Sequence, residues 1–163
     1  MISLPARRAA VSPLMITYCQ ISVHDREYAQ EKELRDRVLR SPLGLRLSEQ
    51  DLRHEDEQIH LVAMDEQGQV IGCAVVALYD DAARIRQMAV EEPYRGQGIG
   101  TELVRRAEQA ARDRNVHTVN IHARVSARGF YEGLGYTTTS EVFTEVTIPH
   151  ITMRKNLAGR PQE

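Results

Sequence analysis

The sequence of 163 residues has few cysteines, no excess of basic residues and no long apolar run. The two cysteines, Cys19 and Cys73, lie far apart and outside any metal-ligand spacing, so we expect reduced thiols and no metal site. The formal net charge of −2 differs from the basic excess that is typical of nucleic-acid-binding proteins. The longest apolar run, GCAVVAL at 72–78, is too short to span a bilayer. We therefore expect a cytoplasmic protein that binds neither nucleic acid nor membrane.

The length of the chain fits one domain rather than two. Residues 1–13 lack the continuous apolar core and the cleavage site of a signal peptide, and we expect them to form a flexible N-terminal extension. The domain is expected at 14–157, with a C-terminal tail at 158–163. The sequence shows no internal repeat and no low-complexity segment.

Hydrophobic patterning predicts an alternation of strands and helices. Strands are expected at 14–21, 59–64, 70–79, 83–90 and 116–123, with the last strands within 136–155. Helices are expected at 25–40, 99–114 and 126–136, with a further short helix at 47–56. Ser48 and Ser126 are the expected caps of the two short helices. Pro149 predicts an edge position or a bend. This order indicates an α/β (α+β) fold with helices on both faces of one mixed sheet.

The stretch YRGQGIG at 94–100 packs three glycines directly before a strong helix pattern. Such a helix start offers free backbone N–H groups and a positive dipole end, which together bind phosphate groups. A P-loop is excluded because no lysine follows, and the third glycine comes one residue too early for a dinucleotide fingerprint. The pattern R-x-x-G-x-G is satisfied by Arg95, Gly98 and Gly100. The alternative is a tight turn without a ligand.

Two separate stretches resemble signatures of the GNAT acetyltransferases. QMAVEEPYRGQGIGTELV looks like the acyl-CoA-binding segment of that family, and SARGFYEGLGY is similar to its later signature. The resemblance extends over residues 14–155, and the stretches ELRDRVL, PLG, HLVA and IPHITM are similar to the ElaA-like bacterial branch. It implies a mixed, mostly antiparallel sheet of six to seven strands that is splayed between strands 4 and 5.

The resemblance also implies the residues that bind acetyl-CoA as cosubstrate. The backbone of the glycine loop would hold the CoA pyrophosphate, and the strand before it would pair with the pantetheine arm. The residues carried over for these roles are Met88, Ala89, Val90, Arg95, Gly96, Gln97, Gly98, Ile99, Gly100, Thr101 and Phe130.

By family analogy, Tyr131 is the general acid, because a phenol is protonated at neutral pH and can donate to the departing thiolate. The alternative is a core tyrosine that packs with Phe130. Where many family members have a catalytic glutamate on the fourth strand, this chain has Gln87, which cannot take a proton. His122 is a candidate base or water-orienting residue.

Several other groups compete for the role of the base. His60 and His150 are alternatives beside predicted strands, and ordered water is the default route for the proton. The acidic run Glu55–Glu57 is expected to be a solvated face, or else to attract a cationic amine.

The leading functional hypothesis is an acetyl-CoA-dependent N-acetyltransferase. It would move the acetyl group directly from CoA to a primary amine of a small molecule or peptide, with both cysteines packed in strands. The rival is a non-catalytic acyl-CoA-binding or sensing protein of the same fold, and a nucleotide-binding module is a third alternative. A homodimer through the strand near 148–155 is a further hypothesis.

Overall fold

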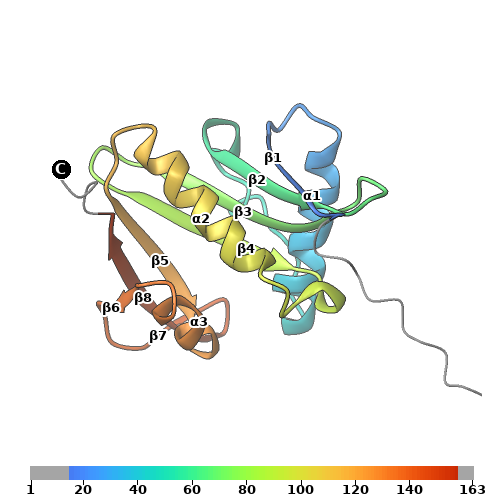
Figure 1. Cartoon of the computed structure of the whole chain (residues 1–163). Coiled ribbons are helices and arrows are strands. Elements are labelled where there is room, and N and C mark those ends of the chain that lie inside the picture. The colour runs from blue at the N-terminus through green and yellow to red at the C-terminus, as the bar shows by residue number, and fades with distance from the viewer. Residues whose placement is uncertain (1–14, 158–163) are drawn as a thin grey trace, which may run out of the picture.

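The computed structural model describes residues 15–157, which form one eight-stranded sheet with helices packed against it (Figure 1). The strand order is β1-β2-β3-β4-β5-β8-β6, and β7 also pairs with β8. The strands are β1 (Thr17–Ile21), β2 (Ile59–Met64), β3 (Val70–Leu78), β4 (Ala83–Val90), β5 (Thr118–Arg124), β6 (Thr137–Thr138), β7 (Phe143–Glu145) and β8 (Ile148–Asn156). The helices are α1 (Glu27–Arg35), α2 (Ile99–Arg112) and α3 (Arg128–Glu132). The expected extension at 1–13 and tail at 158–163 lie outside the described residues.

The predicted fold class is confirmed. All strand pairs are antiparallel except β4 and β5, which pair in parallel. This parallel pairing covers only Ala83–Ile85 on β4 and Val119–Ile121 on β5, although both strands continue beyond it. The two strands therefore separate into a V-shaped opening. The sheet has eight strands rather than the expected six to seven, because the short strands β6 and β7 both pair with β8.

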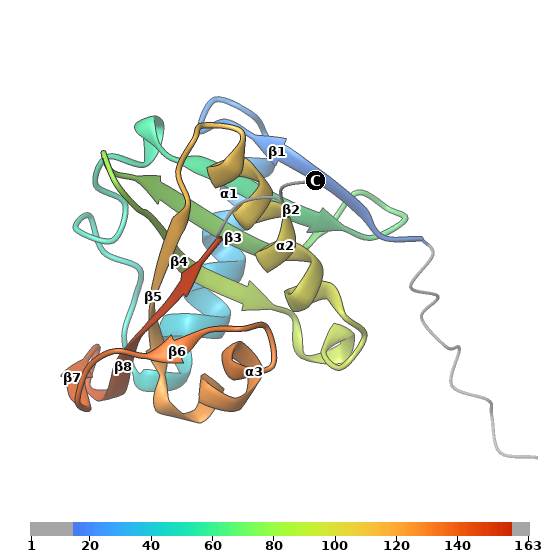
Figure 2. The same ribbon diagram turned by 60° about the vertical axis from the view of Figure 1, so that its left-hand side comes forward.

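Helices cover both faces of the sheet, as expected (Figure 2). α2 packs Leu103 and Ala107 against one face, in a core shared with Leu61 and Ala63 of β2. α1 packs Leu34 against the other face, where Val62 of β2 points. Neighbouring side chains of a strand point to opposite faces, so the continuous apolar run of β2 fills both layers.

β4 contains a bulge at the point where it leaves β5. Cys73 of β3 pairs with Ala89 and Val75 pairs with Arg86, so Gln87 and Met88 together lie opposite a single residue of β3. Gln87 has a φ of 51°, in the left-handed region that is uncommon for a residue other than glycine. A bulge bends its strand and redirects its side chains, and here it lies directly before the glycine loop.

Two local predictions are wrong. The segment 47–56 forms turns that lead into a short 3₁₀ helix at Glu55–Glu57, and not the expected helix. The capping contacts themselves are present: the N–H of Asp51 donates to Ser48 Oγ (3.1 Å) and the N–H of Ser48 to Asp51 Oδ2 (2.9 Å). Asp51 is also paired with Arg40 at 3.0 Å, so tertiary contacts decide the path of this segment. Ser126 does not cap α3, because Ser126 lies inside a 3₁₀ turn at Val125–Ala127 and the N-cap position of α3 is Ala127.

The remaining predictions about strands and helices fit the structure. Cys19 lies in β1 and Cys73 in β3, and both are free thiols. Pro149 lies one residue beyond the part of β8 that pairs with β5. β8 has partners on both sides, and the homodimer through it stays a prediction. Across residues 15–157, no helix combines the length and the apolar character that crossing a membrane requires.

Candidate active site

The glycine loop connects β4 to the start of α2. Gly96 (φ 77°) and Gly98 (φ 83°) both adopt the left-handed conformation, which other residues rarely adopt. Gly98 is the N-cap of α2, and no side chain there caps the free N–H groups. Gly100 has a different role, since a Cβ at this position would lie 3.3 Å from the Phe130 ring. Two glycines shape the turn and the third permits close contact with Phe130.

A groove runs over this loop and gathers most of the residues expected to bind the cosubstrate. It is lined by Met88–Val90, by Arg95, Gly96 and Gly98–Thr101, and by Phe130. Gln97 is the one predicted residue outside this lining, and its Nε2 donates to the Pro93 carbonyl at 3.4 Å. The Nε of Arg95 donates to the Val90 carbonyl at 2.9 Å, which holds this side chain beside the end of β4.

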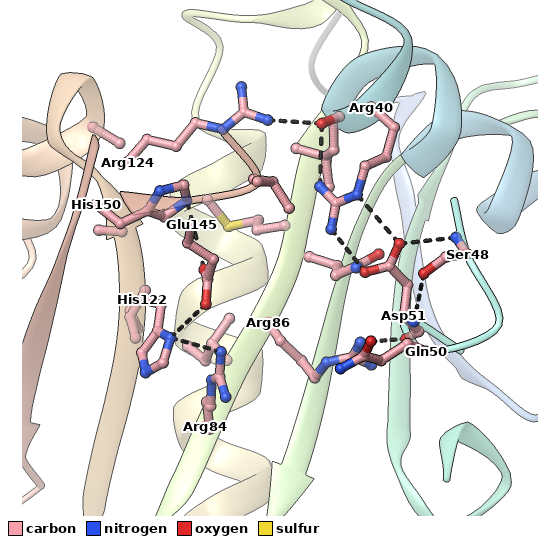
Figure 3. A pocket seen from close by; sticks show the side chains of 18 of the residues that line it. Arg40, Ser48, Gln50, Asp51, Arg84, Arg86, His122, Arg124, Glu145 and His150 are labelled. Carbon is pink, nitrogen blue, oxygen red and sulfur yellow. Dashed lines mark hydrogen bonds and ion pairs between the residues drawn. The ribbon is translucent and has the colours of Figure 1, made fainter. Parts of the chain in front are cut away.

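A second cavity, here called the acceptor cavity, opens on the sheet face opposite α2 (Figure 3). It has a volume of about 860 Å³ and is bordered by the π-helical turn Asp36–Arg40 that continues α1, the 45–58 segment, β4, β5 and the β7–β8 hairpin. It shares Met88, Arg124, Ala127 and Phe130 with the groove. The two spaces therefore meet at the opening between β4 and β5. Most of the polar lining, including Arg84, Arg86, Arg124, Asp51 and Glu145, was not predicted from the sequence.

Tyr131 lines the acceptor cavity and is only 6% exposed. Its ring lies edge-on against Phe130 (centroids 4.9 Å apart) and Tyr136 (5.8 Å apart), so it belongs to the core as well as to the cavity. Its hydroxyl lies 4.0 Å from the sulfur of Met88, a weak acceptor. Burial raises the pKa of Tyr131, so this hydroxyl is protonated at neutral pH.

The three candidate histidines have different surroundings. His122 lies in the acceptor cavity, with its Nδ1 2.9 Å from Arg84 Nη2 and 3.1 Å from Glu145 Oε1. A neutral Nδ1 accepts from Arg84, whereas a protonated Nδ1 donates to Glu145, so the two contacts are alternatives. His150 also lines the cavity, with its Nδ1 2.9 Å from the Ile148 carbonyl.

His60 lies in a different place, buried beneath α1. Its Nδ1 is 3.0 Å from both carboxylate oxygens of Glu31, and its Nε2 is 2.8 Å from the Glu55 carbonyl. With both ring nitrogens occupied, it has a structural role. The described residues contain no cluster of three histidines, cysteines, aspartates or glutamates that could hold a metal ion.

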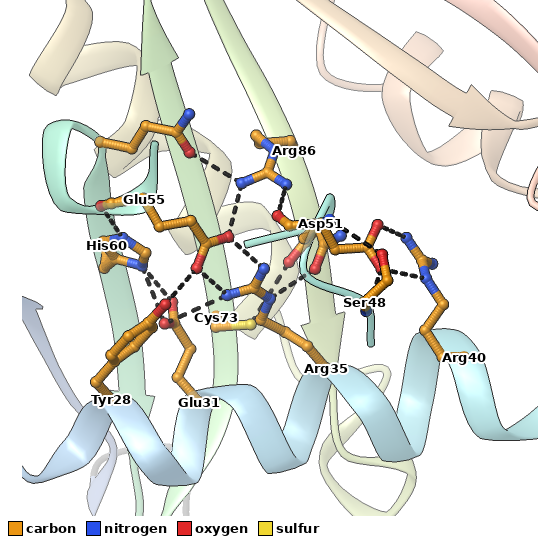
Figure 4. A network of polar contacts seen from close by, with 12 residues as sticks. Tyr28, Glu31, Arg35, Arg40, Ser48, Asp51, Glu55, His60, Cys73 and Arg86 are labelled. Carbon is orange, nitrogen blue, oxygen red and sulfur yellow. Dashed lines mark hydrogen bonds and ion pairs between the residues drawn. The ribbon is translucent and has the colours of Figure 1, made fainter. Parts of the chain in front are cut away.

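The prediction that Glu55–Glu57 forms a solvated face is wrong for Glu55. This residue is the centre of a buried polar network (Figure 4). Tyr28 Oη donates to Glu55 at 2.7 Å, Arg86 Nη1 at 2.8 Å and Arg35 Nη1 at 2.9 Å. Arg35 also donates from Nε to the side-chain oxygen of Gln87, at 2.6 Å. The network therefore connects α1 to the β4 bulge. Nothing in the helical pattern around Arg35 distinguishes a buried arginine from an exposed one.

The ionisation of Glu55 predicts a specific pH dependence of stability. Burial alone would raise its pKa, but hydrogen bonds and charge from Arg35 outweigh burial and lower the pKa from 4.5 to about 2. A depressed pKa in the folded state stabilises the protein above the unfolded value, and this contribution is lost as pH falls from about 4.5 towards 2.

We therefore expect the free energy of unfolding, measured by urea denaturation, to fall between pH 5 and pH 3. The fall should be smaller in Glu55→Gln than in the unmodified chain. Equal slopes in the two proteins would contradict this assignment.

Comparison with known proteins agrees with this geometry. The family model described as the acetyltransferase (GNAT) domain matches residues 25–157. A Bacillus subtilis (strain 168) protein provisionally assigned as an acetyltransferase is 32% identical over 114 residues, which cover 70% of this chain and 76% of that protein. The crystal structure of an N-acetyltransferase assigned in Lactobacillus plantarum is similar, with a TM-score of 0.78 and 25% identity over 87% of this chain and 98% of its own.

More distant structures share the fold. An aminoglycoside 6'-N-acetyltransferase complexed with coenzyme A has a TM-score of 0.72 and 18% identity over 90% of this chain and 99% of its own. Escherichia coli ElaA has a TM-score of 0.75 and 20% identity over 86% of this chain and 99% of its own, which shows a common fold without establishing the branch. The match over residues 25–157 establishes the family: the chain belongs to the GNAT acetyltransferases.

Proposed function

We propose that this protein transfers the acetyl group of acetyl-CoA directly to a primary amine of a small molecule or peptide. The observation that supports this best is the meeting of the glycine-loop groove and the acceptor cavity at Met88 and Phe130. A donor in the groove and an acceptor in the cavity would reach each other through the opening between β4 and β5. The CoA complex of a structural neighbour with this fold supports the choice of donor.

The groove suits the two polar parts of acetyl-CoA. The N–H groups of residues 95–101 would hold the pyrophosphate, since the left-handed glycines leave the start of α2 uncapped by any side chain. Beyond Ile85, β4 has no pairing with β5, so the backbone of Met88–Val90 can pair with the amides of the pantetheine arm.

The reaction needs an unprotonated amine and a protonated leaving group. The amine nitrogen forms a bond to the thioester carbon, the C–S bond breaks, and the sulfur takes a proton while the nitrogen loses one. Tyr131 is the proposed donor to sulfur, because its hydroxyl is kept protonated by burial and lies beside Met88 where the two spaces meet. His122, or a water molecule that it orients, is the proposed acceptor of the amine proton. Gln87 is held by Arg35 and cannot take part as a base.

Substituting Gly98→Glu tests the donor site. The glutamate would bring negative charge to the place proposed for the pyrophosphate. We therefore expect calorimetric titrations to show a Kd of acetyl-CoA that is at least about 100-fold higher than in the unmodified protein. NAD should not bind to the unmodified protein.

A matched control is available at Gly68, in the β2–β3 turn. Gly68 (φ 76°) and Gly98 (φ 83°) have similar left-handed backbones, and a Cβ at either meets open space. Gly68→Glu therefore carries the same backbone strain and charge, yet should retain acetyl-CoA binding. Equal loss in both variants would indicate a folding defect, and unchanged binding in Gly98→Glu would contradict the proposed donor site.

The alternative is a non-catalytic protein that binds or senses acyl-CoA. Gln87 in place of a carboxylate on β4 is the observation that favours it. Both functions predict acetyl-CoA binding, and only the enzyme predicts release of CoA in the presence of an amine.

A further inference from the structure

The acceptor cavity has a large excess of positive charge. Six arginines line it, against the two carboxylates of Asp51 and Glu145. Two of these arginines have a counter-ion within the fold. Arg40 pairs with Asp51 at 3.0 Å, and Arg86 with the buried Glu55 at 2.8 Å. These two serve the structure.

Two further arginines, Arg46 and Arg53, are exposed, where water screens their charge. Arg84 and Arg124 remain. Neither has an ion pair with a carboxylate of residues 15–157 at a distance of 4.0 Å or less. Glu145 is directed instead at the ring nitrogens of the two cavity histidines, at 3.1 and 3.7 Å.

The guanidinium group of Arg84 has a hydrogen-bond donor without a partner among the described residues. Its Nη2 contacts His122 Nδ1 at 2.9 Å, while its Nε is buried and has no hydrogen-bond partner among the described residues. A partly buried cation in this condition is stabilised when an anion binds in the same cavity.

Arg124 is similar. Its Nη2 donates to the Leu39 carbonyl at 2.9 Å, and burial together with the nearby charge of Arg40 lowers its pKa. Arg124 also lies where the cavity meets the groove.

The sheet itself directs these cations towards the cavity. Side chains alternate along a strand, so Arg84 and Arg86 of β4 point away from the buried Ala83 and Ile85, which pack on the α2 side. On β5, Ala123 packs in that same core, which directs Arg124 to the cavity side. Figure 3 shows these side chains around the same space. An acceptor in this cavity therefore meets a cationic face.

We propose that the acceptor is an amine that also carries an anionic oxygen group, a carboxylate or a phosphate, and that Arg84 and Arg124 bind this group in the acceptor cavity. This inference rests on the proposed N-acetyltransferase function. A purely cationic acceptor such as a polyamine would be repelled by the same face. Guanidinium groups suit both anions, since they offer paired donors to two oxygens.

The test uses matched acceptors. Amino acids are compared with their amides and with their decarboxylated amines, and O-phosphoethanolamine with ethanolamine. Release of CoA gives kcat/KM, and calorimetry gives direct binding to the CoA-saturated protein, so the question is decided even for compounds that are not acetylated. In at least one series, we expect the acidic acceptor to have a kcat/KM and an affinity about 10- to 100-fold higher than its neutral counterparts, the usual effect of a charged hydrogen bond.

The variant Arg84→Gln then identifies the binding residue. It should remove most of this preference by raising KM for the acidic acceptor. An effect through the contact of Arg84 with His122 would instead lower kcat for acidic and neutral amines alike. Arg84→Lys, which keeps the charge, should recover part of the preference. Arg105→Gln, an exposed α2 position that lines neither space, loses the same charge and should have no effect.

Three results would overturn the inference. In the first, neutral amines bind and react as well as their acidic counterparts. In the second, Arg84→Gln lowers the activity toward acidic and neutral amines equally, which would indicate an effect through His122. An Arg124→Gln variant with weaker acetyl-CoA binding and unchanged acceptor KM would assign Arg124 to the donor. In each case acetyl transfer itself would still be observed. Failure of the underlying function would instead appear as acetyl-CoA binding without transfer to any amine.

Discussion

Replacing Tyr131 by phenylalanine should lower kcat by about 100- to 1000-fold, the usual contribution of a general acid. Only the hydroxyl group is removed. Its contact with the sulfur of Met88, a weak acceptor at 4.0 Å, contributes little to the stability of the fold. The ring keeps its edge-on packing with Phe130 and Tyr136. The Kd of acetyl-CoA and the free energy of unfolding should therefore change little.

The neighbouring Tyr136 supplies the control for this change. It is buried, lines neither space, and donates to Glu108 at 2.8 Å, while Glu108 keeps its partner Lys155 at 3.0 Å. Tyr136→Phe should therefore leave kcat within about twofold and instead cost about 1 kcal/mol of stability. If Tyr131→Phe kept full kcat, Tyr131 would be a core residue and the proton would reach the sulfur by another route.

Replacing Arg35 by methionine should destabilise the fold by about 3–5 kcal/mol, because it removes from two buried carboxylates, Glu31 and Glu55, the arginine that pairs with both. Arg35 and Glu31 have fully buried side chains, and Arg35 binds Glu55 through both terminal nitrogens. The side chain of Gln87 would lose its donor as well. Urea denaturation at pH 7 measures the effect as a fall in the midpoint.

Arg37, two residues further along the same helical segment, provides the control. It is paired with Glu91, but its side chain is 55% exposed, so Arg37→Met should cost at most about 1 kcal/mol. Adding Glu55→Gln to Arg35→Met should recover part of the loss, since one uncompensated charge is removed. Equal effects of Arg35→Met and Arg37→Met would contradict the view that the network in Figure 4 stabilises the fold.

The sequence predicts the fold where local chemistry decides the conformation. β4 begins and ends at the predicted residues 83 and 90, and α2 begins at Ile99, directly after the glycine that caps it. These signals depend on period-two and helical patterns and on glycines that the backbone requires. The part of the groove formed by residues 88–101 could be predicted for the same reason, since these lining residues are almost consecutive in the sequence.

The acceptor cavity could not be predicted in this way, because distant segments build it. The pairing of Arg35 with Glu55 joins residues 20 positions apart, and Gln87 depends on a bulge that no local pattern marks. Ser48 and Asp51 show the limit most clearly, since their capping contacts form without a helix. Long-range pairing of charges determines the conformation of these segments, and a single sequence does not reveal which charged residues pair.

Mass spectrometry of the products formed from acetyl-CoA and the paired amines tests the central proposal most directly. We expect the unmodified protein to form an N-acetylated amine with release of one CoA per product, Gly98→Glu to form none, and Tyr131→Phe to form it at least about 100-fold more slowly. Tight binding of acetyl-CoA without acetylation of any amine would contradict the account and favour an acyl-CoA-sensing protein.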